Sequence, residues 1–111
     1  MTRRIAPWQV WWTDFDPQVG QEQAGRRPAI VVGTTLACSL PNRLVIAVPC
    51  TTKNRGLPFQ PAVELEQPSF AMCDQVKSIS VNRLVKQHSA TLRATEIEAI
   101  KFALRQIIDV G

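Results

Sequence analysis

The chain has 111 residues, enough for a single domain over residues 1–111, and its 45% hydrophobic content excludes wholesale disorder. It has no secretory signal, no apolar run of membrane length and no C-x-x-C pair among its three cysteines. We therefore expect a cytoplasmic protein with no membrane partner, no disulfide framework and no zinc site. The net charge is +4, and all of the excess lies in residues 1–57, which hold seven basic and three acidic residues. Such an asymmetry suits a polyanionic partner.

Short strand patterns dominate the first three quarters of the chain. Alternation over residues 8–14 predicts a strand, with Trp8, Val10 and Trp12 on one face and Gln9, Trp11 and Thr13 on the other. Nearly continuous apolar runs at residues 28–35 and 43–50 predict strands that are buried on both faces. Residues 36–42 are predicted as a connection that ends in a turn at Pro41 and Asn42. Further strands are predicted over residues 62–65, 69–79 and 83–88.

The last segment of the chain has the periodicity of a helix instead. Apolar residues recur there at intervals of three and four, at Ile97, Ile100, Leu104, Ile107 and Ile108. Charged residues fall on the other face, at Glu96, Glu98, Lys101 and Arg105. Thr95 and Glu98 stand at capping-box spacing, so the helix is predicted to begin near Thr95. Five or six short strands followed by one helix predict a mainly β fold, a small curved sheet or partial barrel.

The most informative stretch is the polar segment at residues 19–28, which leads into a β-branched strand. Gly20 and Gly25 allow the segment to fold back on itself, and Pro28 is predicted to open the strand. Arg26 and Arg27 therefore lie where the loop enters a rigid element. A guanidinium group has a fixed fork of donors that suits phosphate oxygens. Taken alone, the charge of the segment favours a solvated hairpin loop.

Two further segments carry polar groups that suit a phosphodiester. Thr51 and Thr52 end a predicted buried strand and are followed by Lys53, Asn54 and Arg55. Hydroxyls and cations together can bind a phosphate, although a hydroxyl-capped turn would use the same residues. In the segment of residues 73–79, Asp74 could orient an arginine or accept a proton, and Lys77 could contact a phosphate. By themselves these two side chains favour the solvent face of a strand.

Together, these segments resemble the MazF/PemK toxins of bacterial toxin–antitoxin systems. The resemblance is carried by Trp11-Trp12-Thr13-Asp14-Phe15-Asp16-Pro17, Gly20-Gln21-Glu22-Gln23-Ala24-Gly25-Arg26-Arg27-Pro28-Ala29, Pro49-Cys50-Thr51-Thr52 and Cys73-Asp74-Gln75-Val76-Lys77-Ser78-Ile79. It covers nearly the whole chain in order. It implies an SH3-like small barrel of the CcdB/PemK plasmid toxin type, assembled as a homodimer. It also implies a metal-independent, cofactor-free endoribonuclease that cuts single-stranded RNA at short sequences and is neutralised by a cognate antitoxin protein.

The resemblance also implies roles for individual residues. Arg27 matches the catalytic arginine of the family, and Thr51 matches its partner threonine. The residues expected to bind RNA or hold the loop are Glu22, Gln23, Arg26, Thr52, Lys53, Asn54, Gln75 and Lys77. RNA supplies its own nucleophile, the 2′-hydroxyl, so the expected products are a 2′,3′-cyclic phosphate and a 5′-hydroxyl. Arginine is a poor base at neutral pH, so Asp74 and Glu22 are the candidates for the general base.

Some positions depart from the family pattern, and two other functions stay open. The departures are Gln9, Gln21, Met72 and Ser80. The alternatives are a non-enzymatic, CcdB-like poison of DNA gyrase and a catalytically inactive module that binds RNA or antitoxin. The only histidine, His88, lies outside all the matching segments and is expected to be structural. The three tryptophans could stack on bases, although packing is favoured for at least two of them.

Overall fold

Strand β3 (Leu44–Thr51) organises the fold, because it pairs with three other strands that all run antiparallel to it. The computed structural model describes residues 4–15 and 25–109. One edge of β3 pairs with β2 (Gly25–Val31). Along the other edge, the first half of β3 pairs with β6 (Lys77–Ser80) and its last two residues pair with β5 (Pro68–Ala71).

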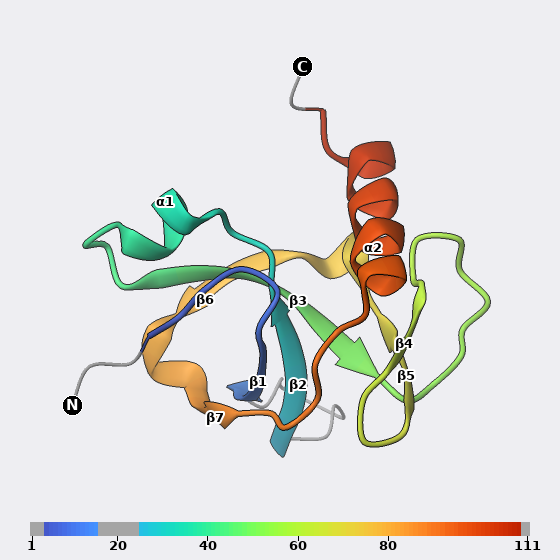
Figure 1. Ribbon diagram of the computed structural model, residues 1–111, viewed down its shortest axis with the longest axis horizontal. Helices are drawn as coiled ribbons and strands as arrows, with labels where there is room; N and C mark the ends of the chain where they lie inside the picture. The colour runs from blue at the N-terminus through green and yellow to red at the C-terminus, as the bar shows by residue number, and fades with distance from the viewer. Residues whose placement is uncertain (1–3, 16–24, 110–111) are drawn as a thin grey trace, which may run out of the picture.

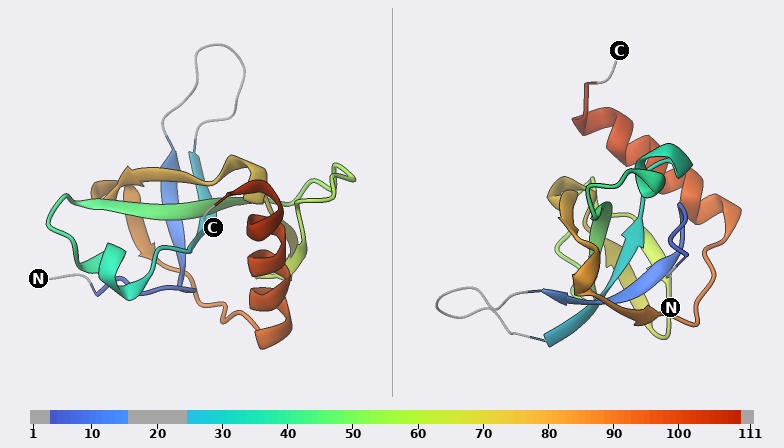
Figure 2. Two further views of the ribbon diagram at one scale, coloured as in Figure 1. Left: turned by 90° about the horizontal axis from the view of Figure 1, so that it is seen from above. Right: turned by 90° about the vertical axis from the view of Figure 1, so that its left-hand side faces the viewer.

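The remaining strands extend this sheet on both sides. Strand β1 (Val10–Phe15) lies between β2 and β7 (Leu84–Gln87), and β4 (Ala62–Glu64) lies beyond β5. The strand order is β4-β5-β3-β2-β1-β7, and β4 and β7 are the unpaired ends of this path in the described chain. The sheet therefore curves without closing (Figure 1, Figure 2). The predicted mainly β fold with a C-terminal helix is thus confirmed. No helix in residues 4–15 and 25–109 has the length and apolar character needed to cross a membrane.

The sheet buries both of its faces, as the long apolar runs predicted. Alternate residues of β2 and β3 enter two separate core clusters. The first cluster packs under helix α2 (Ala94–Ile107) and contains Val10, Ile30, Val48, Cys50, Val63, Ala71, Cys73, Leu92, Ile100 and Ala103. The second contains Trp11, Ala29, Val31, Val45, Ala47, Ile79 and Leu84. Strand β3 departs from the prediction at its start, where Leu44 and Ile46 are 44% and 38% exposed.

Helix α2 begins two residues earlier than predicted. Its N-cap is Arg93 and the capping carboxylate is Glu96, so the cap predicted from Thr95 and Glu98 is wrong. The Glu96 carboxylate accepts the N–H groups of Arg93 and Glu64, both at 2.7 Å, and its side chain is buried rather than on a polar face. The Glu64 N–H belongs to β4, so its acceptor must face the sheet. Thr95 is exposed and therefore cannot be that acceptor.

Several strand boundaries also differ from the prediction. The predicted connection at residues 36–42 contains a short helix, α1 (Thr35–Ser39). The predicted strand at residues 69–79 is divided by a 3-10 turn, η1 (Cys73–Gln75), which lets β5 and β6 follow the same edge of the twisted β3. A second such turn, η2 (Val81–Arg83), precedes β7. Trp8 lies before β1 in a turn with a φ of 70°, and it packs against the first core cluster.

Candidate active site

Strands β2 and β3 bring Arg27 and Thr51 to the same end of the sheet, where both line one pocket. The ladder between β2 and β3 pairs Ala29 with Pro49, and the same register, continued by two residues, aligns Arg27 with Thr51. Residues opposite each other in an antiparallel pair point to the same face. Strand β2 already begins at Gly25, so both arginines belong to the strand, and Pro28 lies inside the strand rather than opening it. The arginines are therefore held on a rigid element.

A pocket of about 210 Å³ lies at this end of the sheet. Four of the residues that the sequence predicts to be functional line it: Arg26, Arg27, Thr51 and Thr52. It is lined by Trp12, Arg26, Arg27, Pro28, Cys50, Thr51, Thr52, Leu65, Glu66, Gln67, Ser69 and His88. Arg26 and Thr52 are exposed, whereas Arg27 and Thr51 are half-buried. Two cationic groups and two hydroxyls thus converge on one hollow, a combination that suits an anionic ligand with several oxygen acceptors.

Beyond Thr51 the chain leaves the sheet in a polar loop whose start is fixed by short hydrogen bonds. The Lys53 N–H donates to Thr51 Oγ1 (3.1 Å), and the Gly56 N–H donates to Asn54 Oδ1 (2.9 Å). Gly56 has a φ of 67°, which a side chain would disfavour. Lys53 and Asn54 are exposed and follow directly after the pocket residues. The loop therefore extends the polar surface outward from the pocket.

The third predicted segment lies elsewhere in the fold. Asp74 and Gln75 are exposed on η1, Lys77 begins β6, and none of the three lines the pocket. The Gln60 side-chain amide donates to Asp74 Oδ1 (3.0 Å), and the Lys77 ammonium lies 5.3 Å from the centre of the Phe15 ring. Glu22 and Gln23 fall outside the described residues. The structure thus gathers Arg26, Arg27, Thr51 and Thr52, and separates them from Asp74, Gln75 and Lys77.

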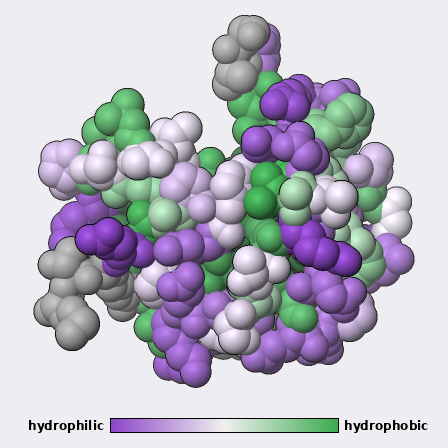
Figure 3. Space-filling view, viewed as in Figure 1, coloured by the Kyte–Doolittle hydropathy of each residue, from purple (hydrophilic) through white to green (hydrophobic). Residues whose placement is uncertain are grey.

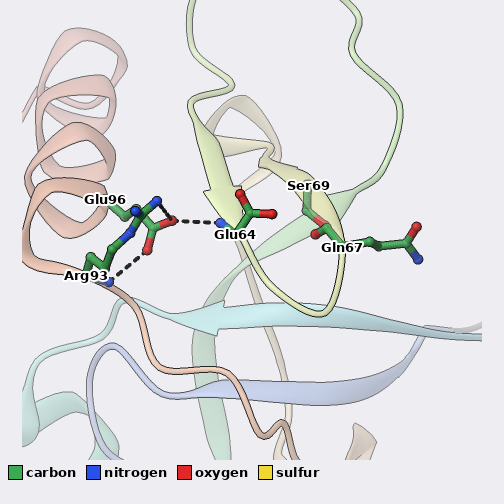
Figure 4. A network of polar contacts seen from close by, with 5 residues as sticks. All are labelled: Glu64, Gln67, Ser69, Arg93 and Glu96. Atoms are coloured by element: carbon green, nitrogen blue, oxygen red, sulfur yellow. Dashed lines mark hydrogen bonds and ion pairs between the residues drawn. The ribbon is translucent and has the colours of Figure 1, made fainter.

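The turn between β4 and β5 supplies a wall of the pocket that no sequence motif predicts. Leu65, Glu66, Gln67 and Ser69 all line it. Ser69 Oγ donates to the carbonyl oxygen of Gln67 (3.0 Å), and Glu96 holds the neighbouring Glu64 N–H from the start of α2 (Figure 4). Burial disfavours the charge on Glu96, but hydrogen bonds from Arg93 and Glu64 outweigh this effect and lower its pKa. An ionised carboxylate therefore ties the pocket wall to the helix.

His88 is the only histidine of the sequence, and it was expected to be structural. It follows β7, is only 4% exposed and lines the pocket. Its ring stacks on Trp12, with ring centroids 4.8 Å apart and an interplanar angle of 28°. Its Nδ1 accepts the Ala90 N–H (2.9 Å), whereas Nε2 is buried and has no hydrogen-bond partner among the residues that the structure describes. No spacing to another motif marks His88 in the sequence, because its position depends on the pairing of β7 with β1.

The thiol at the pocket does not add a nucleophile. Burial, followed by the neighbouring Cys73, raises the pKa of Cys50 to about 12. Burial and Asp74 likewise raise the pKa of Cys73 to about 11. Because the thiolate is the reactive form of cysteine, both thiols are unreactive at neutral pH. Cys50 therefore contributes packing to the pocket.

The described departures from the family pattern have structural roles away from the pocket. Gln9 Oε1 accepts the Ala6 N–H (3.0 Å) and the Trp11 indole N–H (2.9 Å). Ser80 Oγ caps η2 by accepting the Asn82 N–H (3.2 Å), and Met72 is buried in the core. Gln21 lies outside the described residues. None of Gln9, Met72 and Ser80 lines the pocket, so these departures do not alter its lining.

Comparison with known proteins finds a matching family and similar curated proteins. Residues 6–108 match the family of PemK-like, MazF-like toxins of type II toxin-antitoxin systems. The chain is 36% identical over 98 residues to the endoribonuclease toxin MazF of Escherichia coli K12, covering 87% of each protein. It is 32% identical over 114 residues to the probable endoribonuclease MazF5 of Mycobacterium tuberculosis, covering 98% of this chain and 97% of that one.

Solved structures give the same result. A MazF structure from Deinococcus radiodurans superposes with a TM-score of 0.78 at 24% identity, covering 96% of this chain and 97% of that chain, and so shows the shared fold. A MazE-MazF structure from the same organism superposes with a TM-score of 0.77 at 26% identity, with the same coverage. The chain therefore belongs to the family of PemK-like, MazF-like toxins of type II toxin-antitoxin systems.

Proposed function

We propose that this protein is an endoribonuclease toxin that cuts single-stranded RNA in the pocket between Arg27 and Thr51. The observation that carries the proposal is the convergence of two arginines and two threonines on one hollow in a member of this toxin family. Two relatives that cover most of the chain are named as endoribonucleases, one of them as a probable one. A gyrase poison has no need of such an arrangement, whereas an inactive RNA-binding module would share it and is distinguished by the absence of cleavage.

The proposed chemistry uses the 2′-hydroxyl of the RNA as the nucleophile. Its oxygen attacks the adjacent phosphorus, the bond to the 5′-oxygen of the next nucleotide breaks, and the products are a 2′,3′-cyclic phosphate and a 5′-hydroxyl. Arg27 stabilises the charge of the phosphorane and donates to the leaving oxygen, while the Thr51 hydroxyl holds a non-bridging oxygen. Of the two candidate acceptors of the 2′-hydroxyl proton, Asp74 does not line the pocket, so Glu22, which lies outside the described residues, stays the proposed one. No metal ion takes part in this scheme.

We further propose two protein partners, a second copy of the chain and a cognate antitoxin. Structures that contain both MazE and MazF are among the similar ones. The exposed cations near the pocket, Arg26 and Lys53, suit an extended acidic segment of the antitoxin as well as RNA. Apolar side chains exposed at α1 and at the start of β3 support the homodimer. RNA and antitoxin are thus expected to compete for one surface.

The experiment that tests this function incubates the purified protein in EDTA with a long single-stranded RNA of mixed sequence. New 5′ ends are mapped, and the 3′ ends are assayed for cyclic phosphate. We expect cuts at a recurring short sequence that disappear in Arg27→Ala. The matched control is Arg105→Ala, which removes an exposed arginine on α2, far from the pocket lining, and is expected to leave cleavage unchanged.

Intact RNA after incubation with a folded wild-type protein would contradict the proposal. In that case, inhibition of DNA gyrase by the same preparation would favour the gyrase poison. RNA binding without cleavage would favour the inactive module. Cleavage that EDTA abolishes would contradict the metal-independent chemistry alone.

A further inference from the structure

Two buried side chains in the described chain carry a polar atom without a hydrogen-bond partner, and their positions differ. They are Gln60, at Oε1, and His88, at Nε2. Gln60 still donates to Asp74 and does not line the pocket. His88 lines the pocket beside Arg27 and Thr51. Most buried polar groups in folded proteins have a hydrogen-bond partner. An unpaired buried atom at a binding pocket therefore suggests that a bound ligand supplies the partner.

The contacts of the His88 ring fix which group Nε2 offers. Because Nδ1 accepts the Ala90 N–H at 2.9 Å, the proton of the neutral imidazole resides on Nε2. The unpaired atom is therefore a hydrogen-bond donor. Stacking on Trp12 holds the plane of the ring, with the centroids 4.8 Å apart. The site thus contains an oriented donor that no group in residues 4–15 and 25–109 uses.

Trp12 adds an aromatic surface to the same wall. Its indole is half-buried and lines the pocket, and β1 pairs its backbone with Pro28 on one side and Lys86 on the other. Aromatic side chains stack on unpaired bases of single-stranded RNA, and nearby donors pair with the edges of those bases. An indole and an N–H donor beside a phosphate-binding group match one nucleotide of an RNA strand.

We propose that Trp12 and His88 form a base-binding subsite, in which Trp12 stacks on an unpaired base beside the cut phosphodiester and His88 Nε2–H donates to an acceptor on that base. This inference rests on the proposed ribonuclease function and assigns it a specificity determinant. The acceptor is a carbonyl oxygen or a ring nitrogen of the base. Because Nε2 is buried, the base must displace side chains of the lining to reach it, and Arg26 and Gln67 are exposed members of that lining.

The test compares variants that separate the ring from its donor. His88→Phe keeps a ring on Trp12 and removes the N–H, whereas His88→Gln places an amide donor near the position of Nε2. We expect His88→Phe to raise the KM for RNA about tenfold with little change in kcat, and to relax base preference at one position next to the cut. His88→Gln is expected to recover part of both losses.

Matched controls come from outside the pocket. Gln60→Leu removes the other unpaired buried atom, and we expect wild-type KM and cut sites from it. Trp12→Leu should relax the same base position as His88→Phe, whereas Trp8→Leu, which truncates a tryptophan outside the pocket lining, should not. Thermal melting of every variant identifies those that fold. If His88→Phe does not fold, the comparison of Trp12→Leu with Trp8→Leu decides.

Wild-type KM and an unchanged base preference in folded His88→Phe would overturn the subsite while leaving the ribonuclease intact. If the wild type cuts no RNA, the proposed function fails separately. The subsite is then tested by binding of 2′-O-methyl RNA oligonucleotides of mixed sequence. Equal binding by the wild type and His88→Phe overturns it, and weaker binding by His88→Phe supports it.

Discussion

The two ends of strand β3 present opposite chemistry to solvent. Its last residue, Thr51, opens onto the polar pocket together with Arg27 from β2. Its start exposes Leu44 and Ile46, and the neighbouring α1 exposes Leu36 and Leu40. Figure 3 shows apolar side chains at the surface over α1, at the upper left. We call the second region, formed by Leu36, Leu40, Leu44 and Ile46, the apolar surface.

This difference assigns different partners to the two ends. An exposed apolar region usually marks a contact with another protein, whereas hydroxyls and guanidinium groups in a hollow suit an anionic ligand. Because one rigid strand carries both regions, a substitution at one end should leave the other end in place. The two functions that we assign, RNA cleavage and self-association, can therefore be separated by mutation.

The largest effect is expected at the pocket end of β3. Thr51→Val keeps the shape of the side chain and removes the hydroxyl that we assign to a phosphate oxygen. Loss of one such donor typically lowers kcat by about 10²–10³-fold, and we expect a decrease in this range. Single-turnover cleavage of a short RNA substrate measures it. Self-association, measured by sedimentation, should stay at the wild-type level.

Thr52→Val is the matched control, because Thr52 lines the same pocket but is exposed and lies beyond the register position that faces Arg27. We expect a decrease of less than about tenfold from it. Equal losses in the two variants would contradict the specific assignment of Thr51.

Elements whose signal is local in the chain were predicted well from the sequence. The buried runs of β2 and β3 and the periodicity of α2 each predicted the correct element, since a continuous apolar run or a 3.6-residue repeat is set by nearby residues. Arg27 and Thr51 were predicted as partners from the family resemblance; both line the pocket, and their roles stay a prediction. The ends of elements were predicted less well. Glu96 caps α2 because it also binds Glu64, which is 32 residues away in sequence.

Parts of the site that depend on long-range pairing were not predictable. His88 reaches the pocket because β7 pairs with β1, and the wall at residues 65–67 reaches it because β5 pairs with β3. The break of β5 from β6 at η1 places Asp74 away from Arg27, although the sequence presents both in motifs of one family. No short-range pattern records such pairings.

The second prediction concerns the support of the pocket wall by Glu96. Glu96→Gln replaces an ionised acceptor of the Arg93 and Glu64 N–H groups by an amide, and we expect the free energy of unfolding to fall by about 1–3 kcal/mol. The pKa of Glu96 is lowered in the folded state, so its stabilising effect is complete above the ordinary glutamate pKa of about 4.5 and is lost as the pH falls further. Urea unfolding at neutral and acidic pH should therefore show a gap between the two proteins that narrows in acid.

Glu98→Gln provides the control for that experiment. Glu98 lies on the same helix, is exposed and pairs only with Lys101, at 3.6 Å. Exposed pairs of this kind contribute about 0–1 kcal/mol, so we expect little change in unfolding at any pH. A pH-independent gap for Glu96→Gln would contradict the ionised cap.

The smallest effect is expected at the apolar surface. Leu44 and Leu57 are almost equally exposed, at 44% and 46%, but Leu57 belongs to the loop after β3, while Leu44 belongs to the apolar surface. If a second copy covers that surface, Leu44→Lys places a charge in the dimer interface and weakens self-association by about tenfold, or ~1.4 kcal/mol. Leu57→Lys should leave the dimer unchanged. Sedimentation equilibrium over a range of protein concentrations measures both. Equal weakening by the two substitutions would mean that self-association does not depend on the apolar surface, and a monomeric wild type would leave that surface to a different protein such as the antitoxin.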